Sequence, residues 1–285
     1  MNRRTAALGL AAALTVTSCG TQEAASPAPP PRYEASLTVL EGGGHGPQLC
    51  GTVQTSDPPQ CGGPDVVGWD WSKVEHESRA GVKWGSYRVV GTWDGARLTL
   101  TEPPGAPVKG QEQPTGEDGF ASPCPEPAGG WRPVDPAKAT LKAMEKAIAR
   151  AGTVAEFAGA WLDQNYPGPP PTTREEMEKQ GNDPKRLVLN LKFTGDLADR
   201  EEWIREVWGG ALCISGAQRS EGELQKTQEQ VVKDVGDGFL SASSSVTRNR
   251  VEVEVWLATD DLRRRTDEKY GKGVVVFDSV LKPVG

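Results

Sequence analysis

The sequence predicts an α+β protein with two folded parts. Short strands separated by turns in residues 34–102 predict a small antiparallel β-barrel or sandwich of the OB-like kind. From Asp135 onward, helical patterns alternate with strands. This predicts an α+β domain at 135–285, with helices over one face of a mixed sheet and ferredoxin-like βαβ units. Proline, glycine and acidic residues without a sustained period fill 103–134, which we interpret as an interdomain linker.

In the first domain, alternation and turn residues predict four strands. Asp94-Gly95 fits a two-residue type I′ turn between the last two of them, because both central positions of that turn need positive φ. The glycine-rich stretch 42–47 is expected to be a loop that leads to Cys50. The expected strands are 34–40, 66–71, 87–93 and 96–101.

In the second domain, periodicity and capping residues predict five helices and five strands. Asp135-Pro136 is typical of a helix start, and Thr259 is a typical N-cap for the last helix. The clearest strand is 251–258, in which valines alternate with glutamates. The expected helices are 135–151, 153–165, 196–208, 221–235 and 260–270, and the expected strands are 187–193, 211–215, 238–246, 251–258 and 273–279.

The N-terminus has the pattern of a secretory signal peptide at 1–18. Arg3 and Arg4 precede an uncharged run at 6–16, which is shorter than the roughly 20 residues that span a bilayer as a helix. The run ends in Val-Thr-Ser-Cys at 16–19, which resembles the lipobox of bacterial lipoproteins. That resemblance implies acylation of Cys19 and cleavage just before it. Two or three acyl chains would anchor the protein stably, and the Pro-rich stretch 19–33 would be an extended spacer.

The charge of the chain is acidic. Removing the leader, which holds two arginines and no acid, takes the 32 basic residues to 30 against 39 acidic ones, so the net charge falls from −7 to −9. Nucleic-acid binding needs a basic stripe, so the composition argues against a nucleic-acid partner. It also argues against adhesion to anionic lipid through the protein surface, which leaves the acyl group as the membrane contact.

With Cys19 acylated, four cysteines remain, and an even number in an exported chain predicts two disulfides. Cys50 and Cys61 are close in sequence and both lie beside Pro/Gly turns, so we expect these two to pair. Cys124 would then pair with Cys213 and tie the linker to the second domain. A zinc site would have to recruit the two histidines, but the chain has no tight Cys-x-x-Cys pair, so we expect no metal and no cofactor.

Trp69, Asp70 and Trp71 are the candidate ligand-binding residues. The two-residue period of a strand would put both tryptophans on one face, with the aspartate opposite. Such a pair would suit stacking against a sugar or peptidoglycan. The favoured interpretation is that a small domain builds its core from large side chains.

The sequence contains no recognised catalytic motif. It has no Gly-x-Ser-x-Gly elbow and no His-Glu-x-x-His pair. Its two histidines, His45 and His76, lie in a glycine loop and a charged stretch. The carboxylates of Asp65, Asp70 and Asp94 could form a glycosidase pair, although no spacing singles them out. We therefore expect no catalytic residue.

Seven segments stand out beside the lipobox: 46–50, 58–63, 67–71, 91–95, 123–127, 270–275 and 281–284. Together these motifs resemble a group of uncharacterised actinobacterial secreted lipoproteins. The resemblance implies an exported, lipid-anchored, cysteine-paired body of two domains on the extracytoplasmic face of the cell membrane, and it transfers no catalytic residues. We expect a non-catalytic binding or envelope-associated protein with an envelope protein or glycan as partner. The alternatives are a glycan- or peptidoglycan-binding module and a hydrolase with an unrecognised carboxylate site.

Overall fold

The computed structural model describes residues 29–108, 118–164, 172–181 and 183–284. The predicted leader, the predicted lipid site at Cys19 and most of the predicted spacer lie outside these residues. Contacts group Pro31–Gly285 into one unit. Among the described residues, no helix combines the length and the apolar character needed to span a membrane. The protein is α+β, as predicted, with five α-helices in its described part.

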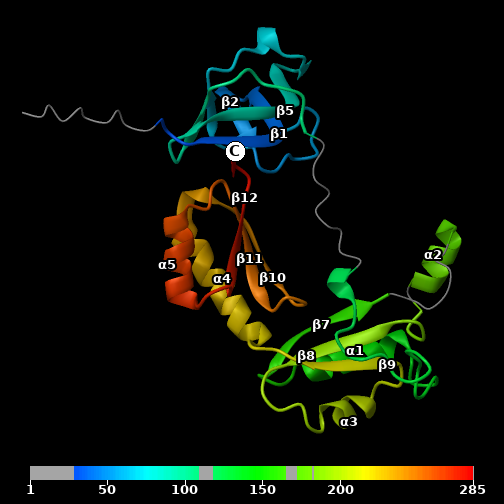
Figure 1. Ribbon diagram of the computed structural model, residues 1–285. Helices are drawn as coiled ribbons and strands as arrows, with labels where there is room; N and C mark the ends of the chain where they lie inside the picture. Colours follow the sequence, from blue (N-terminus) through cyan, green and yellow to red (C-terminus); the bar gives the residue numbers. More distant parts are fainter. Residues whose placement is uncertain (1–28, 109–117, 165–171, 182, 285) are drawn as a thin grey trace, which may run out of the picture. The chain divides into compact units, whose positions relative to one another are not determined.

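A seven-stranded sheet forms the N-terminal part of the fold (Figure 1). Its order is β13-β1-β2-β3-β6-β5-β4, and β1 also pairs with β5. The strands are β1 (Arg32–Gly42), β2 (His45–Cys50), β3 (Asp65–Val67), β4 (Glu77–Arg79), β5 (Val82–Trp93), β6 (Arg97–Leu100) and β13 (Lys282–Pro283).

Strand β1 organises this sheet because it is paired on both edges. It runs antiparallel to β5 over ten residue pairs, and its other edge pairs with β2 and β13. The sheet is not a closed barrel, since only one residue pair, Gln48 with Asp65, joins β2 to β3. Strand β13 brings the C-terminal residues into the N-terminal sheet, and Leu281 just before it is fully buried in this sheet's core.

Two turns in this sheet differ from the prediction. Strand β2 begins at His45, inside the predicted loop, because Gly43 and Gly44, with φ of 64° and 86°, make a two-residue hairpin turn. The turn between β5 and β6 has three residues instead of two. There the Asp94 carboxylate accepts hydrogen bonds from the backbone N–H groups of Ala96 and Arg97. Glycine runs and Asp-Gly pairs therefore predicted turns correctly but not their lengths.

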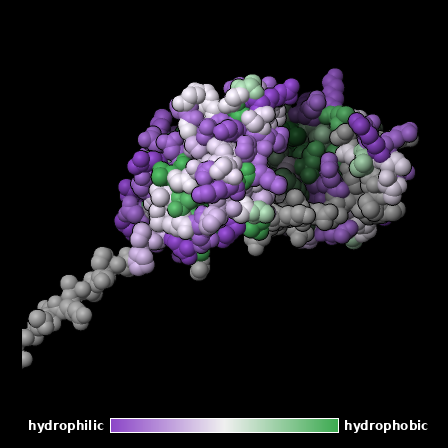
Figure 2. Space-filling model, turned by 90° about the horizontal axis from the view of Figure 1, so that it is seen from above, coloured by the Kyte–Doolittle hydropathy of each residue, from purple (hydrophilic) through white to green (hydrophobic). Residues whose placement is uncertain are grey.

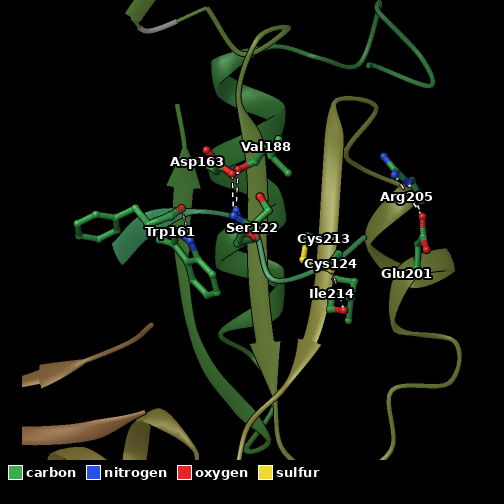
Figure 3. Close-up of a disulfide and its surroundings, with 11 residues drawn as sticks. Ser122, Cys124, Trp161, Asp163, Val188, Glu201, Arg205, Cys213 and Ile214 are labelled. Carbon is green, nitrogen blue, oxygen red and sulfur yellow. Dashed lines mark hydrogen bonds and ion pairs between the residues drawn. A yellow bond between two sulfur atoms is a disulfide. The ribbon is translucent and has the colours of Figure 1, made fainter. Parts of the chain in front are cut away.

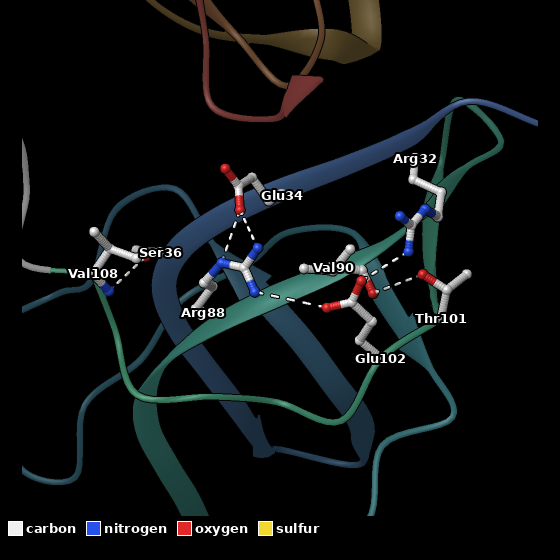
Figure 4. Close-up of polar contacts among 8 residues, drawn as sticks. All are labelled: Arg32, Glu34, Ser36, Arg88, Val90, Thr101, Glu102 and Val108. Atoms are coloured by element: carbon white, nitrogen blue, oxygen red, sulfur yellow. Dashed lines mark hydrogen bonds and ion pairs between the residues drawn. The ribbon is translucent and has the colours of Figure 1, made fainter. Parts of the chain in front are cut away.

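The start of the predicted linker lies against the N-terminal sheet. Arg88 on β5 bonds to Glu34 on β1 and lies 3.7 Å from Glu102, which also accepts a hydrogen bond from Arg32 at 2.7 Å (Figure 4). Further along, the Val108 backbone N–H donates to a serine hydroxyl on β1. Residues 102–108 are therefore held on the sheet, as part of its surface. The face of the molecule seen in Figure 2 is largely hydrophilic, in keeping with the acidic composition.

The rest of the chain consists of two units with the same element order, αββαβ. Each has a three-stranded sheet in which the first pair is antiparallel and the second is parallel. The first unit contains α1 (Leu141–Ala151), β7 (Phe157–Asp163), β8 (Val188–Phe193), α3 (Arg200–Arg205) and β9 (Ala211–Gly216), with α2 (Arg174–Gly181) between β7 and β8. The second unit contains α4 (Glu221–Val235), β10 (Phe239–Ser245), β11 (Arg250–Val255), α5 (Asp260–Tyr270) and β12 (Val275–Ser279).

The two units agree in strand register as well as in order. In each, the first strand begins with a phenylalanine that pairs with the last residue of the next strand, Phe157 with Phe193 and Phe239 with Val255. The register of both hairpins then shifts within the next two residues. A shared bulge position is hard to obtain by chance, so we interpret the two units as an internal repeat.

Helices α1 and α3 pack on one face of the first unit's sheet, and α4 and α5 pack on one face of the second unit's sheet. Alternate residues of the middle strand supply the core, with Leu189, Leu191 and Phe193 in the first unit and the valines of β11 in the second. The βαβ connections expected from the sequence are present as β8-α3-β9 and β11-α5-β12. The expected single mixed sheet is wrong, because the repeat divides the strands into two separate sheets.

Within residues 153–165, where the sequence predicted a helix, Phe157–Asp163 form strand β7. The prediction relied on Phe157 and Trp161, four residues apart. That spacing places two side chains together on a helix and also leaves them on one face of a regular strand, so it does not distinguish the two. These residues form a strand because they pair with β8. Two other helices are shorter than expected: α1 begins after its cap Thr140, and α3 covers only Arg200–Arg205.

Helices α4 and α5 have the predicted bounds because their caps are explicit in the sequence. The Ser220 hydroxyl accepts from the Glu223 N–H while the Glu223 carboxylate accepts from the Ser220 N–H, which makes a complete capping box. Thr259 caps α5 through the backbone N–H of Leu262.

Candidate functional site

Trp69, Asp70 and Trp71 do not lie on one strand face. Strand β3 ends at Val67, and Trp71 begins a short 3-10 helix that Asp70 caps. The Asp70 carboxylate accepts hydrogen bonds from the N–H and hydroxyl of Ser72, and these bonds lower the pKa of Asp70. Asp70 therefore stabilises a turn, as Asp94 does in its own turn.

The two tryptophan rings pack edge to face inside an aromatic cluster. Their centroids are 5.2 Å apart with an interplanar angle of 67°, and Trp69 also contacts Tyr87 at 4.9 Å. Trp71 is 8% exposed, and its Nε1 donates to Glu41 at 2.8 Å. Sugar stacking needs a flat, open aromatic face, which buried Trp71 does not offer, while Trp69 is partly exposed. The geometry agrees with the core interpretation of these residues.

The structure forms the two disulfides that the sequence predicts. Cys50 bonds to Cys61 beside β2, and Cys124 bonds to Cys213 on β9. Disulfides persist in oxidising compartments, so the pair indicates an extracytoplasmic location. The second disulfide also fixes an irregular segment, residues 118–134, which we call the strap.

The strap crosses the face of the first unit's sheet that lies opposite α1 (Figure 3). At β7, the Trp161 Nε1 donates to the Phe120 carbonyl at 2.9 Å, and the Ser122 N–H donates to the Asp163 carboxylate at 2.7 Å. At β9, the strap is bonded covalently through Cys124. We call the sheet surface beneath it the covered face.

The covered face is buried although its residues are mixed in polarity. Alternation along the strands assigns eight side chains to it, and Asn190 at its centre has no exposed surface. Trp131 and Cys124 of the strap pack against its apolar members. The face is made of Trp161, Asp163, Val188, Asn190, Lys192, Ala211, Cys213 and Ser215.

Lys192 stands at one end of the covered face. Its Nζ donates to the carbonyls of Thr247 at 2.6 Å and Val246 at 3.4 Å, and lies 5.1 Å from the centroid of the Trp161 ring. Burial lowers the pKa of this ammonium group. The contact joins the first sheet to the turn between β10 and β11.

The covered face was not predicted, because the alternation along 187–193 is typical of a half-buried strand. The alternation of Val188, Asn190 and Lys192 with leucines suggested a polar side open to water, yet β8 is buried on both faces. The position of Cys124 was the available signal, because its predicted pairing already placed the linker on β9.

Within the described part of the chain, no strap covers the corresponding face of the second unit. Strand register matches Ser243, Glu252 and Val276 with Trp161, Asn190 and Cys213 of the first unit. Ser243 is exposed and Glu252 is partly exposed. The two units therefore carry different residues at these three positions, and the residues are more buried in the first unit than in the second.

A shallow depression of about 280 Å³ lies between α4 and α5. Inside it, the Asp234 carboxylate accepts hydrogen bonds from Lys269 at 2.6 Å and Tyr270 at 2.5 Å. These bonds lower the pKa of Asp234, and the Asp234 bond raises that of Lys269. The shifts hold both groups in their ordinary charged states, so the cluster is an ion pair without a group tuned for proton transfer. Its lining is Asp234, Leu262, Arg265, Thr266, Lys269 and Tyr270.

The described residues bring no catalytic constellation together. The one histidine hydrogen bond among them joins His76 Nδ1 to the Val74 carbonyl at 3.1 Å. No group of three His, Cys, Asp or Glu side chains within the described ranges is placed to hold a metal ion. Comparison with protein-family models and with curated proteins found no match to this chain.

Proposed function

We propose that this chain is a lipid-anchored extracytoplasmic protein that acts by binding rather than by catalysis. The two disulfides carry the extracytoplasmic part of the proposal, because they need an oxidising compartment. The Val-Thr-Ser-Cys sequence at 16–19 supports acylation of Cys19, and the Pro-rich spacer supports a body displaced from the membrane. Both features fit the proposed relationship to actinobacterial secreted lipoproteins.

The non-catalytic part rests on how the polar side chains are used. Asp70 and Asp94 each hold a turn, Asp234 holds two neighbours, and Asp163 holds the strap. A carboxylate pair for hydrolysis would need one group with a raised pKa. Among the described carboxylates, every resolved pKa shift is downward. This supports binding over the hydrolase alternative.

We propose an envelope protein as the partner in preference to a glycan, since the edge-to-face packing of Trp69 and Trp71 supports a core role for them. The acidic charge supports a partner that is not a nucleic acid. For the fold, pairing of β1 on both edges supports an OB-like origin of the first sheet. The βαβ connections support a ferredoxin-like origin of the repeats.

The test is intact mass of the full chain purified from the membranes of a bacterial host that exports lipoproteins. We expect a chain that starts at Cys19, carries acyl mass and gains four hydrogens on reduction. Cys19→Ser should lose the acyl mass and leave the membrane fraction. A Cys50→Ser/Cys61→Ser variant is the matched control, because it removes two cysteines but should keep the lipid. An unacylated wild-type chain would refute the anchor.

A further inference from the structure

Unpartnered buried polar atoms concentrate on the covered face. Within the described residues, four buried side-chain atoms have no hydrogen-bond partner. One is Trp69 Nε1 in the aromatic cluster. The other three are Ser122 Oγ on the strap, Asn190 Oδ1 on β8 and Ser215 Oγ on β9. In native proteins nearly all buried polar groups form hydrogen bonds. Three buried polar atoms without a protein partner on one face therefore indicate a common partner.

The strand register places Asn190 and Ser215 on the covered face, near its centre. Asn190 lies on the middle strand, opposite Cys213, and Ser215 is two residues further along the same side of β9. The strap reaches Ser122 above β7 and β8 before it bonds to Cys213, as Figure 3 shows. None of the three atoms bonds to another protein group, so a single bridging molecule can serve all of them.

Asn190 is the decisive residue. Its Nδ2 donates to the Val188 carbonyl at 3.1 Å, which satisfies one end of the amide and leaves Oδ1 to accept from another donor. The side chain is 0% exposed, so bulk solvent cannot serve as that donor. In the second unit, partly exposed Glu252 stands at this position. Both units therefore have a polar residue at this position, although in the first unit the strap buries it.

We propose that the covered face holds a buried water site, in which an ordered water donates to Asn190 Oδ1 and bonds to the Ser122 hydroxyl, with Ser215 as a third ligand. A buried water typically makes about three such bonds to otherwise unsatisfied groups. The strap is then attached to the sheet by water as well as by the disulfide and two direct hydrogen bonds.

The first test is Asn190→Leu, an apolar replacement of similar size, in the full chain without its leader. If water bridges Asn190 to the strap, the variant removes one hydrogen-bond partner of that water and weakens its bond to the Ser122 hydroxyl. We then expect Tm to fall by about 2–6 °C. If Oδ1 is unbonded, leucine removes an unpaired polar atom and Tm rises, which overturns the proposal. Ser243→Ala on the uncovered face is the control and should leave Tm unchanged.

The second test measures the buried water itself. Magnetic relaxation dispersion of water oxygen-17 counts long-lived internal waters, and we expect that count to fall in Asn190→Leu. Ser122→Ala gives a second variant should the leucine variant fail to fold, and it should lower the same count. Because both side chains share one water, the Tm losses in the double variant should be smaller than the sum of the singles. An unchanged count, or additive losses, overturns the proposal.

Discussion

Removing the Cys124–Cys213 disulfide should destabilise the protein more than removing Cys50–Cys61. The first pair is separated by 89 residues and the second by 11. In the chain-entropy description, closing the longer loop restricts the unfolded state by about 4–5 kcal/mol and closing the shorter one by about 3 kcal/mol. Cys124→Ala/Cys213→Ala also frees the strap, so contacts of the covered face weaken in the folded state too.

Urea unfolding followed by tryptophan fluorescence measures both variants. We expect the free energy of unfolding to fall by roughly 4 kcal/mol for Cys124→Ala/Cys213→Ala and by less for Cys50→Ala/Cys61→Ala. Phe120 on the strap is 61% exposed, so chymotrypsin should cut there sooner once the disulfide is gone. Equal losses in the two variants, or unchanged cleavage at Phe120, would show that the strap is held without its covalent bond and would refute the reasoning.

Three further changes test the packing and charge arguments. Ser220→Ala removes the capping box of α4 and should cost about 1 kcal/mol in urea unfolding, whereas Ser243→Ala on the uncovered face should cost little; similar losses would contradict the cap. Trp256→Ala should cost about 3–5 kcal/mol, because Trp256 is 5% exposed in the core of the seven-stranded sheet; a loss under 1 kcal/mol by the same measurement would argue against that contact. Asp234→Asn removes the carboxylate that Lys269 bonds. Since the folded pKa of Asp234 is lowered, its contribution is present above the unfolded pKa near 4 and is lost as pH falls through the folded pKa. The Tm of this variant should therefore lie below wild type at neutral pH and converge with it in acid, and a gap that persists at low pH would disprove the ion pair.

The repeat shows where sequence patterns failed. The sequence predicted most strands of the two units, yet it did not reveal that they repeat, because their alignment depends on strand register. Phe157 and Phe239 occupy the same place in their sheets, but the residues that follow share little. Residues 153–165 had a spacing compatible with either helix or strand, and only β8 settled the choice.

At the candidate sites, too, the sequence left open what the tertiary structure decided. Trp69 and Trp71 were predicted either to pack in a core or to bind sugar, and their contact angle supports packing. Asn190 carried no signal in the sequence, since one asparagine in an alternating strand is ordinary. Its burial comes from the strap, which arrives from about 70 residues away in the chain.

The sequence by itself determined the local features of this protein. Cap residues Ser220 and Thr259 set the starts of α4 and α5, and the short spacing of Cys50 and Cys61 favoured their pairing. These follow from interactions between neighbours in the chain. The tertiary structure decided the pairing of β1 with β5 and β13, the separation into two repeated sheets, and the burial of Asn190. Those features depend on which segments, distant in the sequence, pack or pair with one another, and local propensity does not determine such contacts.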